Sequence, residues 1–262
     1  MPENNYVDVN GLKMFYIEKG EGQTLILLHG GISVADDNWA NQIEFFSKYF
    51  RVIATDSRGH GRTNNPTEEF SYKIMADDIA ALIQELNLEN PSVCGWSDGG
   101  QIVLEIGINH PDLAKALVVG GVLSEISDNY LSTMKFWGIE GPGNVDFDKL
   151  REVIPQFAKK LPEIHSAVYG PEYWKKLLQD ISKMWLDPSE FPGKRIEQIK
   201  TPVLIITGDR DAAISIDESV KIYKSIPNAE LAIIPSADHD VCYTKPDLFN
   251  NMVLEFLTRH KE

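Results

Sequence analysis

The segment 95–99, Gly-Trp-Ser-Asp-Gly, could supply a reactive serine at Ser97. The apolar residues 93–94 lead into this segment, and a helix-like pattern follows it from residue 100. A G-x-S-x-G sequence between a strand and a helix is typical of a sharp turn that exposes a nucleophilic hydroxyl. Side chains at Gly95 and Gly99 would crowd the neighbouring strand and helix. The pattern therefore predicts that Ser97 is a nucleophile, at a helix N-terminus whose free N–H groups favour negative charge.

Two later residues, Asp211 and His239, could activate this serine. Asp211 ends the turn 208–211 after an apolar run, and His239 follows the apolar run 229–234. A histidine can take the proton of a serine hydroxyl and later protonate the leaving group. A carboxylate can fix the imidazole and stabilise its charged form. Asp209 is the alternative acid in the same turn, and either carboxylate could also be an ordinary loop residue.

The other histidines and one arginine have simpler interpretations. His29 follows an apolar strand and is expected to be a buried, hydrogen-bonded structural residue. Arg58 and His60 lie in the loop 56–62 and are expected to pack and form hydrogen bonds within it. The remaining three histidines are expected at the surface: His110, His165 and His260.

Apolar runs alternate with segments of helical periodicity along most of the chain. Strands are expected at 6–10, 12–18, 24–28, 51–55, 93–94, 116–119, 202–207 and 229–234, and helices at 38–49, 71–87, 100–109, 217–225 and 246–260. The Asn10-Gly11 pair predicts a hairpin between the first two strands, and Ser71 is the expected N-cap of its helix. This alternation predicts an α/β fold, with a mostly parallel eight-stranded sheet between helices. Sites in such sheets form at the carboxyl ends of the strands.

The pattern changes in the segment 123–200, which we call the cap insert. No strand is evident there, aromatic residues are frequent, and prolines and glycines divide the segment into short pieces. We expect helices inserted between two strands of the sheet, with some of the aromatic side chains lining a pocket. The predicted organisation is a core of residues 1–122 and 201–262 with a helical cap of residues 123–200.

Composition limits the class of protein. A formal charge of −14 on 262 residues argues against nucleic-acid binding. No apolar run approaches membrane-spanning length, and the N-terminus has no signal-peptide pattern, so the expected location is the cytoplasm. The spacing of the two cysteines suggests neither a metal site nor a disulfide framework. No cofactor or metal motif is present, so none is expected.

The chain resembles the α/β-hydrolase fold family, whose triad runs in the order serine, acid, histidine. The resemblance covers the whole chain, since the cap insert is similar to the family's cap or lid. It implies that Ser97, Asp211 and His239 are catalytic, because the family's acid usually occupies the second position of such a pair. It also implies an oxyanion hole made by the backbone N–H groups of Gly31 and Asp98.

Two features depart from the family's usual pattern. His239 lies between Asp238 and Asp240, where the family more often has glycine before the histidine. These acids could raise the basicity of the imidazole or mark a different turn. The acidic Asp98 follows Ser97, as in the biphenyl-hydrolase-like valacyclovir hydrolases, which favour α-amino-acid esters and hold the substrate's ammonium with this residue. Asp98 could therefore favour amino-bearing esters, or could only interact with the helix dipole.

The expected activity is hydrolysis of small-molecule carboxylic esters through an acyl-enzyme, by a monomer or homodimer that binds neither nucleic acid nor membrane. Ser97 argues against haloalkane dehalogenases and epoxide hydrolases, which use aspartate at this position. The resemblance leaves open a lactonase, C–C bond hydrolase, aminopeptidase, perhydrolase or α-amino-acid ester hydrolase. A small-molecule receptor of the same fold is the non-enzymatic alternative.

Overall fold

The computed structural model describes residues 3–260, and its main sheet has eight strands in the order β1-β2-β4-β3-β5-β6-β9-β10. The strands are β1 (Glu3–Val9), β2 (Leu12–Lys19), β3 (Thr24–Leu28), β4 (Arg51–Thr55), β5 (Ser92–Trp96), β6 (Ala116–Gly120), β9 (Val203–Gly208) and β10 (Ala229–Ile234). Only the pairs β1·β2 and β2·β4 in this sheet are antiparallel. The predicted eight-stranded, mostly parallel sheet is confirmed.

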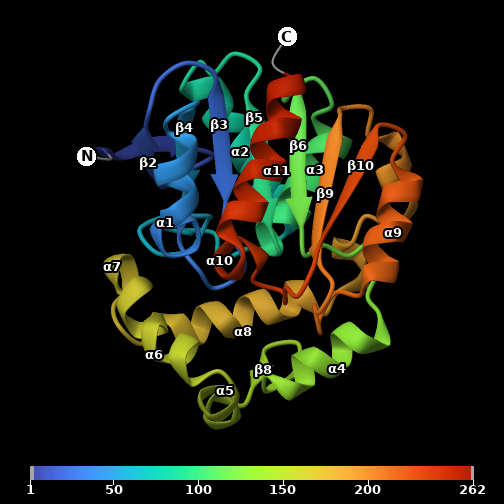
Figure 1. Ribbon diagram of the computed structural model, residues 1–262. Helices are drawn as coiled ribbons and strands as arrows, with labels where there is room; N and C mark the ends of the chain where they lie inside the picture. Colours follow the sequence, from blue (N-terminus) through green and yellow to red (C-terminus); the bar gives the residue numbers. More distant parts are fainter. Residues whose placement is uncertain (1–2, 261–262) are drawn as a thin grey trace.

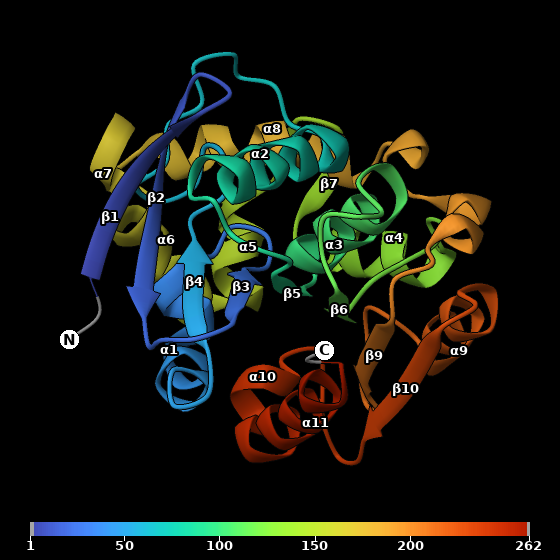
Figure 2. The ribbon, with the colours of Figure 1, turned by 90° about the horizontal axis from the view of Figure 1, so that it is seen from above.

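Helices cover both faces of the sheet: α2 (Tyr72–Glu85) and α3 (Asp98–Asn109) lie on one face, and α1 (Ala35–Phe46) and α11 (Pro246–Arg259) on the other (Figure 2). Alternate residues of β3 separate the two layers of the core. Ile26 and Leu28 pack in the cluster that includes α2 and α3, whereas Leu25 and Leu27 pack with α1 and α11. This alternation explains why β3 is apolar throughout. Two shorter helices follow β9 and β10, namely α9 (Ile216–Ser225) and α10 (Val241–Thr244).

The local signals in the sequence hold at several turns. Asn10 and Gly11 have φ angles of 48° and 78°, as a tight hairpin turn between β1 and β2 requires. The Ser71 hydroxyl accepts a hydrogen bond from the Lys73 N–H, which confirms it as the N-cap of α2.

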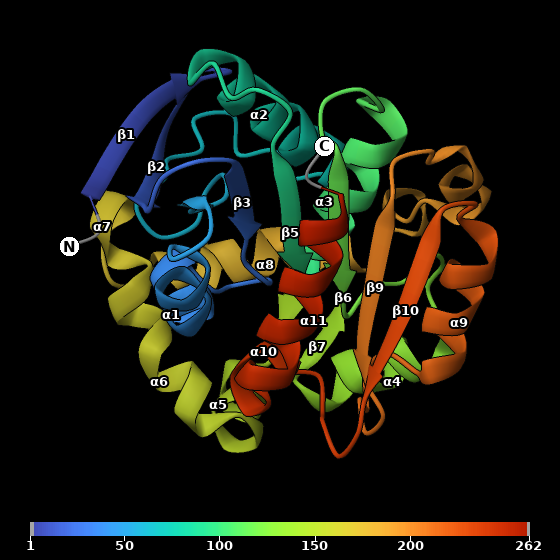
Figure 3. The same cartoon turned by 45° about the horizontal axis from the view of Figure 1, so that its top comes forward.

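Strands β1 and β10 form the two edges of the twisted sheet (Figure 3). No helix within residues 3–260 is long and apolar enough to cross a lipid bilayer.

The cap insert lies across the carboxyl ends of the parallel strands, with α8 (Tyr173–Trp185) running beneath the sheet (Figure 1). Its other elements are α4 (Asp128–Phe136), β7 (Ile139–Gly141), β8 (Asn144–Val145), α5 (Phe147–Val153), α6 (Pro155–Ile164), α7 (Ser166–Tyr169), η1 (Pro188–Glu190) and η2 (Gly193–Gln198). The expectation that this segment contains no strand is wrong, because Pro142 and Gly143 turn the chain into a short hairpin. The division of the chain into a core and a separate cap domain of residues 123–200 stays a prediction.

Candidate active site

Ser97 occupies a strained turn between β5 and α3, in residues 95–99, which we call the elbow. Its φ and ψ angles are 54° and −118°, in a region that non-glycine residues rarely adopt. Its N–H donates to the Gly120 carbonyl, 2.8 Å away, which anchors the elbow to β6. A Cβ atom at Gly95 would collide with the Gly99 carbonyl, and one at Gly99 would collide with the Leu28 carbonyl. The steric reason expected for both glycines is confirmed.

Asp211 and His239 meet at the ends of the neighbouring strands β9 and β10. His239 Nδ1 lies 2.7 Å from Asp211 Oδ2, and Asp211 Oδ1 accepts the N–H groups of Ala213 and Ile214, both at 2.8 Å. Asp209 instead accepts the Ala237 N–H at 3.2 Å. The structure therefore places Asp211, rather than Asp209, beside His239.

The environment of His239 favours its protonated form. Enclosure by the protein is the largest single effect and lowers the pKa of His239, whereas the hydrogen bond and the charge of Asp211 raise it. The charges of Asp240 and Asp238 add to the result, so the pKa of His239 is raised above its usual value. The Trp96 indole N–H donates to the His239 carbonyl at 2.9 Å and helps to fix the loop. The flanking acids therefore contribute to the raised basicity of the His239 imidazole, which is one of the two interpretations that the sequence left open.

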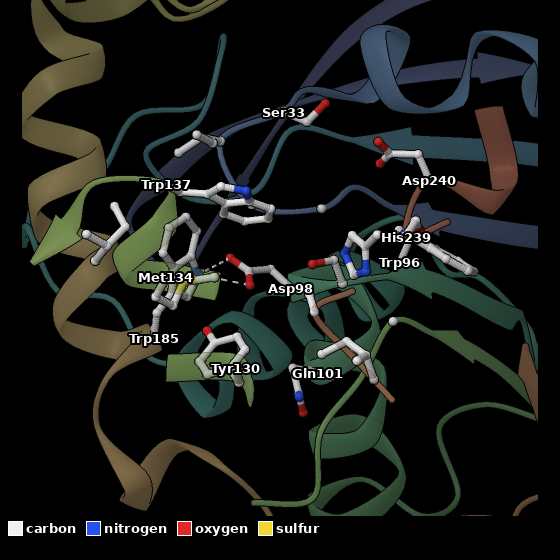
Figure 4. Close-up of a pocket in the computed structure, with 18 of the residues that line it drawn as sticks. Ser33, Trp96, Asp98, Gln101, Tyr130, Met134, Trp137, Trp185, His239 and Asp240 are labelled. Atoms are coloured by element: carbon white, nitrogen blue, oxygen red, sulfur yellow. Dashed lines mark hydrogen bonds between the residues drawn. The ribbon is translucent and has the colours of Figure 1, made fainter. Parts of the chain in front are cut away.

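Ser97 and His239 line one cavity, of about 250 Å³, between the strand ends and the cap insert (Figure 4). The loop after β3 lines the same cavity. A Cβ atom at Gly30 would lie 3.3 Å from Ser97 Cβ, and one at Gly31 would lie 2.6 Å from Asp98 Oδ2. This loop therefore lies directly against the elbow. Asp98 is the first residue of α3, where a backbone N–H has no acceptor within the helix.

The carboxylate of Asp98 is held by two aromatic side chains. The Trp185 indole N–H lies 3.0 and 2.8 Å from the two carboxylate oxygens, and the Tyr72 hydroxyl donates to Oδ1 at 2.8 Å (Figure 4 shows the Trp185 contacts). Burial raises the pKa of Asp98 to about 6, although both hydrogen bonds act to lower it. No lysine or arginine pairs with this carboxylate among the described residues, and the charge of His239 is the smallest of the effects that lower its pKa. The carboxylate is therefore buried and accepts its hydrogen bonds from two neutral donors, Tyr72 and Trp185.

Sequence reasoning missed the contribution of Tyr72 and Trp185. They lie 26 and 87 residues from Asp98, on α2 and at the end of α8. The only signal for Trp185 was the general frequency of aromatic residues in the cap insert, and Tyr72, which lies outside that segment, had none. No spacing rule connects a tryptophan in an insert with an acid in an elbow. The contact exists because α8 passes across the carboxyl ends of the strands.

Most of the cavity wall is apolar. The cap insert contributes Leu123, Tyr130, Met134, Trp137, Ile139, Leu150, Ile154, Phe157, Leu178, Trp185 and Phe191. The charged groups in the described lining are the carboxylates Asp98 and Asp240 and the titratable His239, without any lysine or arginine. A substrate carboxylate would therefore meet two carboxylates and no lysine or arginine there, with His239 as the one cation in the described lining, whereas a neutral or cationic substrate would fit the charge of the cavity.

The histidines outside the cavity have structural roles. His29 is buried and accepts the Ser57 N–H at 2.9 Å, as expected for a structural residue. His60 is also buried, and Arg58 pairs with Asp78 at 2.8 Å. These observations agree with the predicted packing roles.

The expectation of a surface position is wrong for His165, which is only 1% exposed. Its Nδ1 accepts the Gly61 N–H and its Nε2–H donates to the Ile32 carbonyl, both at 3.0 Å. Burial lowers the pKa of His165 to about 4, so the imidazole is neutral at pH 7. This residue joins the cap insert to two loops of the core, a role that no sequence pattern indicated.

The described residues contain no cluster of metal-ligating side chains, and both cysteines are unpaired. Within residues 3–260, no three His, Cys, Asp or Glu side chains are grouped so that they could hold a metal ion. Cys94 and Cys242 are both buried and free. The reactive side chains that line the cavity are Ser97, His239 and the carboxylates of Asp98 and Asp240.

Comparisons with known proteins agree with this architecture. The chain is 25% identical to 2-hydroxy-6-oxo-6-(2'-aminophenyl)hexa-2,4-dienoic acid hydrolase of Metapseudomonas resinovorans, over 98% of this chain and 91% of that protein. It is 24% identical to the human serine hydrolase BPHL, over 96% and 85% of the two chains. The meta-cleavage product hydrolase CumD of Pseudomonas fluorescens IP01 has the same fold, with a TM-score of 0.83, 22% identity and 97% coverage of both chains. The model of the alpha/beta hydrolase fold matches residues 23–246, and the chain therefore belongs to the α/β-hydrolase family, related to biphenyl-hydrolase-like enzymes.

Proposed function

We propose that this hydrolase cleaves carboxylic esters through an acyl-enzyme formed on Ser97. The observation that carries the proposal is the Asp211–His239 pair, 2.7 Å apart, in which the imidazole lines the same cavity as the strained Ser97. The imidazole that faces this cavity would take the proton of the Ser97 hydroxyl as it attacks the ester carbonyl. Asp211 would keep the remaining proton on His239 Nδ1 and stabilise the imidazolium.

The tetrahedral intermediate needs donors for its negative oxygen. The N–H groups of Gly31 and Asp98 are the proposed pair, because the β3 loop lies against the elbow. Collapse of the intermediate breaks the C–O bond, and His239 gives its proton to the leaving alcohol. Water then attacks the acyl-Ser97 ester with His239 again as the base, which releases the acid and restores the hydroxyl.

The charge of the cavity favours an ester over the substrate named for one relative. That relative hydrolyses a hexadienoic acid, which carries a carboxylate. The described lining of this cavity has no lysine or arginine to pair with such a group. A neutral ester avoids the free-energy cost of burying a carboxylate without a cationic partner. A lactone, which is a cyclic ester, remains an alternative substrate for the same residues.

Asp98 supports a second candidate, hydrolysis of α-amino-acid esters. Its carboxylate lines the cavity and has no lysine or arginine partner in the described residues, so a substrate ammonium would pair with it favourably. The test compares an amino-acid ester with its desamino analogue in the wild type and in Asp98→Asn. Equal selectivity in the two proteins would exclude this candidate.

The first experiment is a panel of p-nitrophenyl esters of increasing acyl length, with matched lactones and Ser97→Ala as the control. Rapid multiple turnovers that depend on Ser97 would support the esterase, and a stronger response to lactones would favour the lactonase. Labelling of Ser97 by a fluorophosphonate without turnover would indicate a selective cavity. A single slow turnover would favour the receptor alternative, and the absence of both turnover and labelling would contradict the proposed nucleophile.

A further inference from the structure

The two carboxylates that line the cavity differ in what they contact. Asp98 accepts hydrogen bonds from Tyr72 and Trp185. The carboxylate of Asp240 makes no hydrogen bond or ion pair with any described residue, although its backbone N–H and carbonyl both do. Asp240 therefore presents an unpaired negative charge at the edge of the cavity.

Asp240 lies at the end of the cavity where His239 is placed. It directly follows His239 and precedes α10, and Figure 4 shows it on the His239 side, away from Met134 and Trp185. Its position remains exposed, in contrast to that of Asp98. The free carboxylate thus lies at the solvent side of the cavity, beside the imidazole.

The proposed reaction places the leaving alcohol of the substrate, rather than its acyl group, near Asp240. His239 must protonate the leaving alcohol, so this alcohol has to lie against the imidazole. The apolar wall formed by the cap insert is then the part of the cavity left for the acyl group. Asp240 is consequently next to the leaving group and remote from the acyl chain.

We propose that Asp240 selects esters whose leaving alcohol carries a positive charge. This inference rests on the proposed ester hydrolysis and extends it to the class of alcohol. A cationic group beside Asp240 would pair with a carboxylate that makes no ion pair within the described residues and acts on His239 only through its charge, and the described cavity lining holds no lysine or arginine that would compete for it. Because the site is exposed, the attraction is moderate and screened by salt.

A neighbouring acid provides a matched control. The Asp238 carboxylate accepts the Asp240 N–H at 3.1 Å and the Thr244 hydroxyl at 3.3 Å, and it is absent from the cavity lining. Asp238→Asn and Asp240→Asn remove the same charge, each within one residue of His239. A general effect of charge on the imidazole would appear in both variants, whereas recognition of the leaving group would be lost only in Asp240→Asn.

The experiment compares propionylcholine with 3,3-dimethylbutyl propionate, two esters of similar shape that differ in the charge of the alcohol. We expect the wild type and Asp238→Asn to prefer the choline ester in kcat/KM by about tenfold, the effect of one charge pair at a partly exposed site. Asp240→Asn should reduce this ratio to about one. A ratio near one in the wild type, or an unchanged ratio in Asp240→Asn, would overturn the proposal.

A second readout separates this inference from the proposed esterase activity. Choline and 3,3-dimethylbutan-1-ol are each tested for protection of Ser97 against labelling by a fluorophosphonate. If no ester is hydrolysed but choline protects Ser97 better than the neutral alcohol, and only while Asp240 is present, the esterase proposal fails, whereas the recognition of a cationic alcohol by Asp240 stands. Equal protection by the two alcohols would overturn the role of Asp240, whether or not esters are hydrolysed.

Discussion

His239 Nδ1 and Asp211 Oδ2 lie 2.7 Å apart, although 28 residues separate them in the chain. The contact forms because β9 and β10 are parallel neighbours, which brings the loops at their carboxyl ends together. The second oxygen of Asp211 is held by two backbone N–H groups, so the carboxylate has little freedom to turn away from the imidazole. This pair is the basis of the first prediction.

Replacing Asp211 with asparagine should lower kcat by about 10⁴, because the neutral amide no longer holds the correct tautomer or stabilises the imidazolium. In the wild type, kcat/KM should rise with pH as His239 loses its proton, with a midpoint above 6.5 because the pKa of His239 is raised. A pH–rate profile measures this midpoint. Asp209→Asn, which leaves the imidazole contact intact, is the control. A wild-type rate in Asp211→Asn would refute the assignment of the acid.

Gly99→Ala should disrupt the elbow, because its methyl group would collide with the Leu28 carbonyl. We expect a loss of about 3 kcal/mol or more in the free energy of unfolding, together with loss of fluorophosphonate labelling at Ser97. Gly141→Ala is the matched control, since its methyl group would meet no atom within 4 Å, and it should change stability by less than about 0.5 kcal/mol. Urea denaturation measures both. Equal stabilities of the two variants would contradict the predicted packing.

Asp98 should make stability depend on pH. Its pKa is raised from 3.8 to about 6 in the folded protein, so the folded state binds this proton more tightly than the unfolded chain does. The resulting stabilisation is present at low pH and is lost as pH rises from about 4 to about 6, with a total of about 3 kcal/mol. Asp98→Asn removes this contribution. The difference in unfolding free energy between wild type and Asp98→Asn, measured at several pH values, should therefore change across this interval.

Trp185→Phe provides a second check on the same carboxylate. The indole hydrogen bond lowers the pKa of Asp98, so its removal should raise that pKa further and extend the pH-dependent interval upward. Two results would show that the carboxylate is not held as described. One is a difference in unfolding free energy between wild type and Asp98→Asn that does not change with pH. The other is a pH-dependent interval that does not move in Trp185→Phe.

His165→Ala should destabilise the protein by about 2–4 kcal/mol. It would leave the buried N–H of Gly61 and the carbonyl of Ile32 without partners and would also create a cavity. His110→Ala is the control, because His110 is partly exposed and pairs with Asp77 at the surface, where an ion pair contributes at most about 1 kcal/mol. Thermal or urea unfolding compares the two. Similar losses in both variants would argue against His165 as a junction between the cap insert and the core.

The sequence by itself determined the strands and helices of the core and their order along the chain, but not the elements of the cap insert. Apolar runs such as 24–28 and 229–234 predicted buried strands, and Asn10-Gly11 and Ser71 predicted a hairpin and a helix start, because each depends on interactions within a few residues. The α/β sheet and the family followed from these signals and from the elbow. The local steric requirement of the elbow was also readable, since a tight turn between a strand and a helix demands glycine on both sides of the serine.

Only the tertiary structure decided which distant side chains meet. It selected Asp211 over Asp209 as the neighbour of His239, placed Trp185 on the carboxylate of Asp98, and buried His165 between two core loops. These contacts join residues up to 133 positions apart. No periodicity or turn rule predicts such pairs, because they depend on how the cap insert packs across the strand ends. That packing is determined by all the apolar surfaces that are buried together.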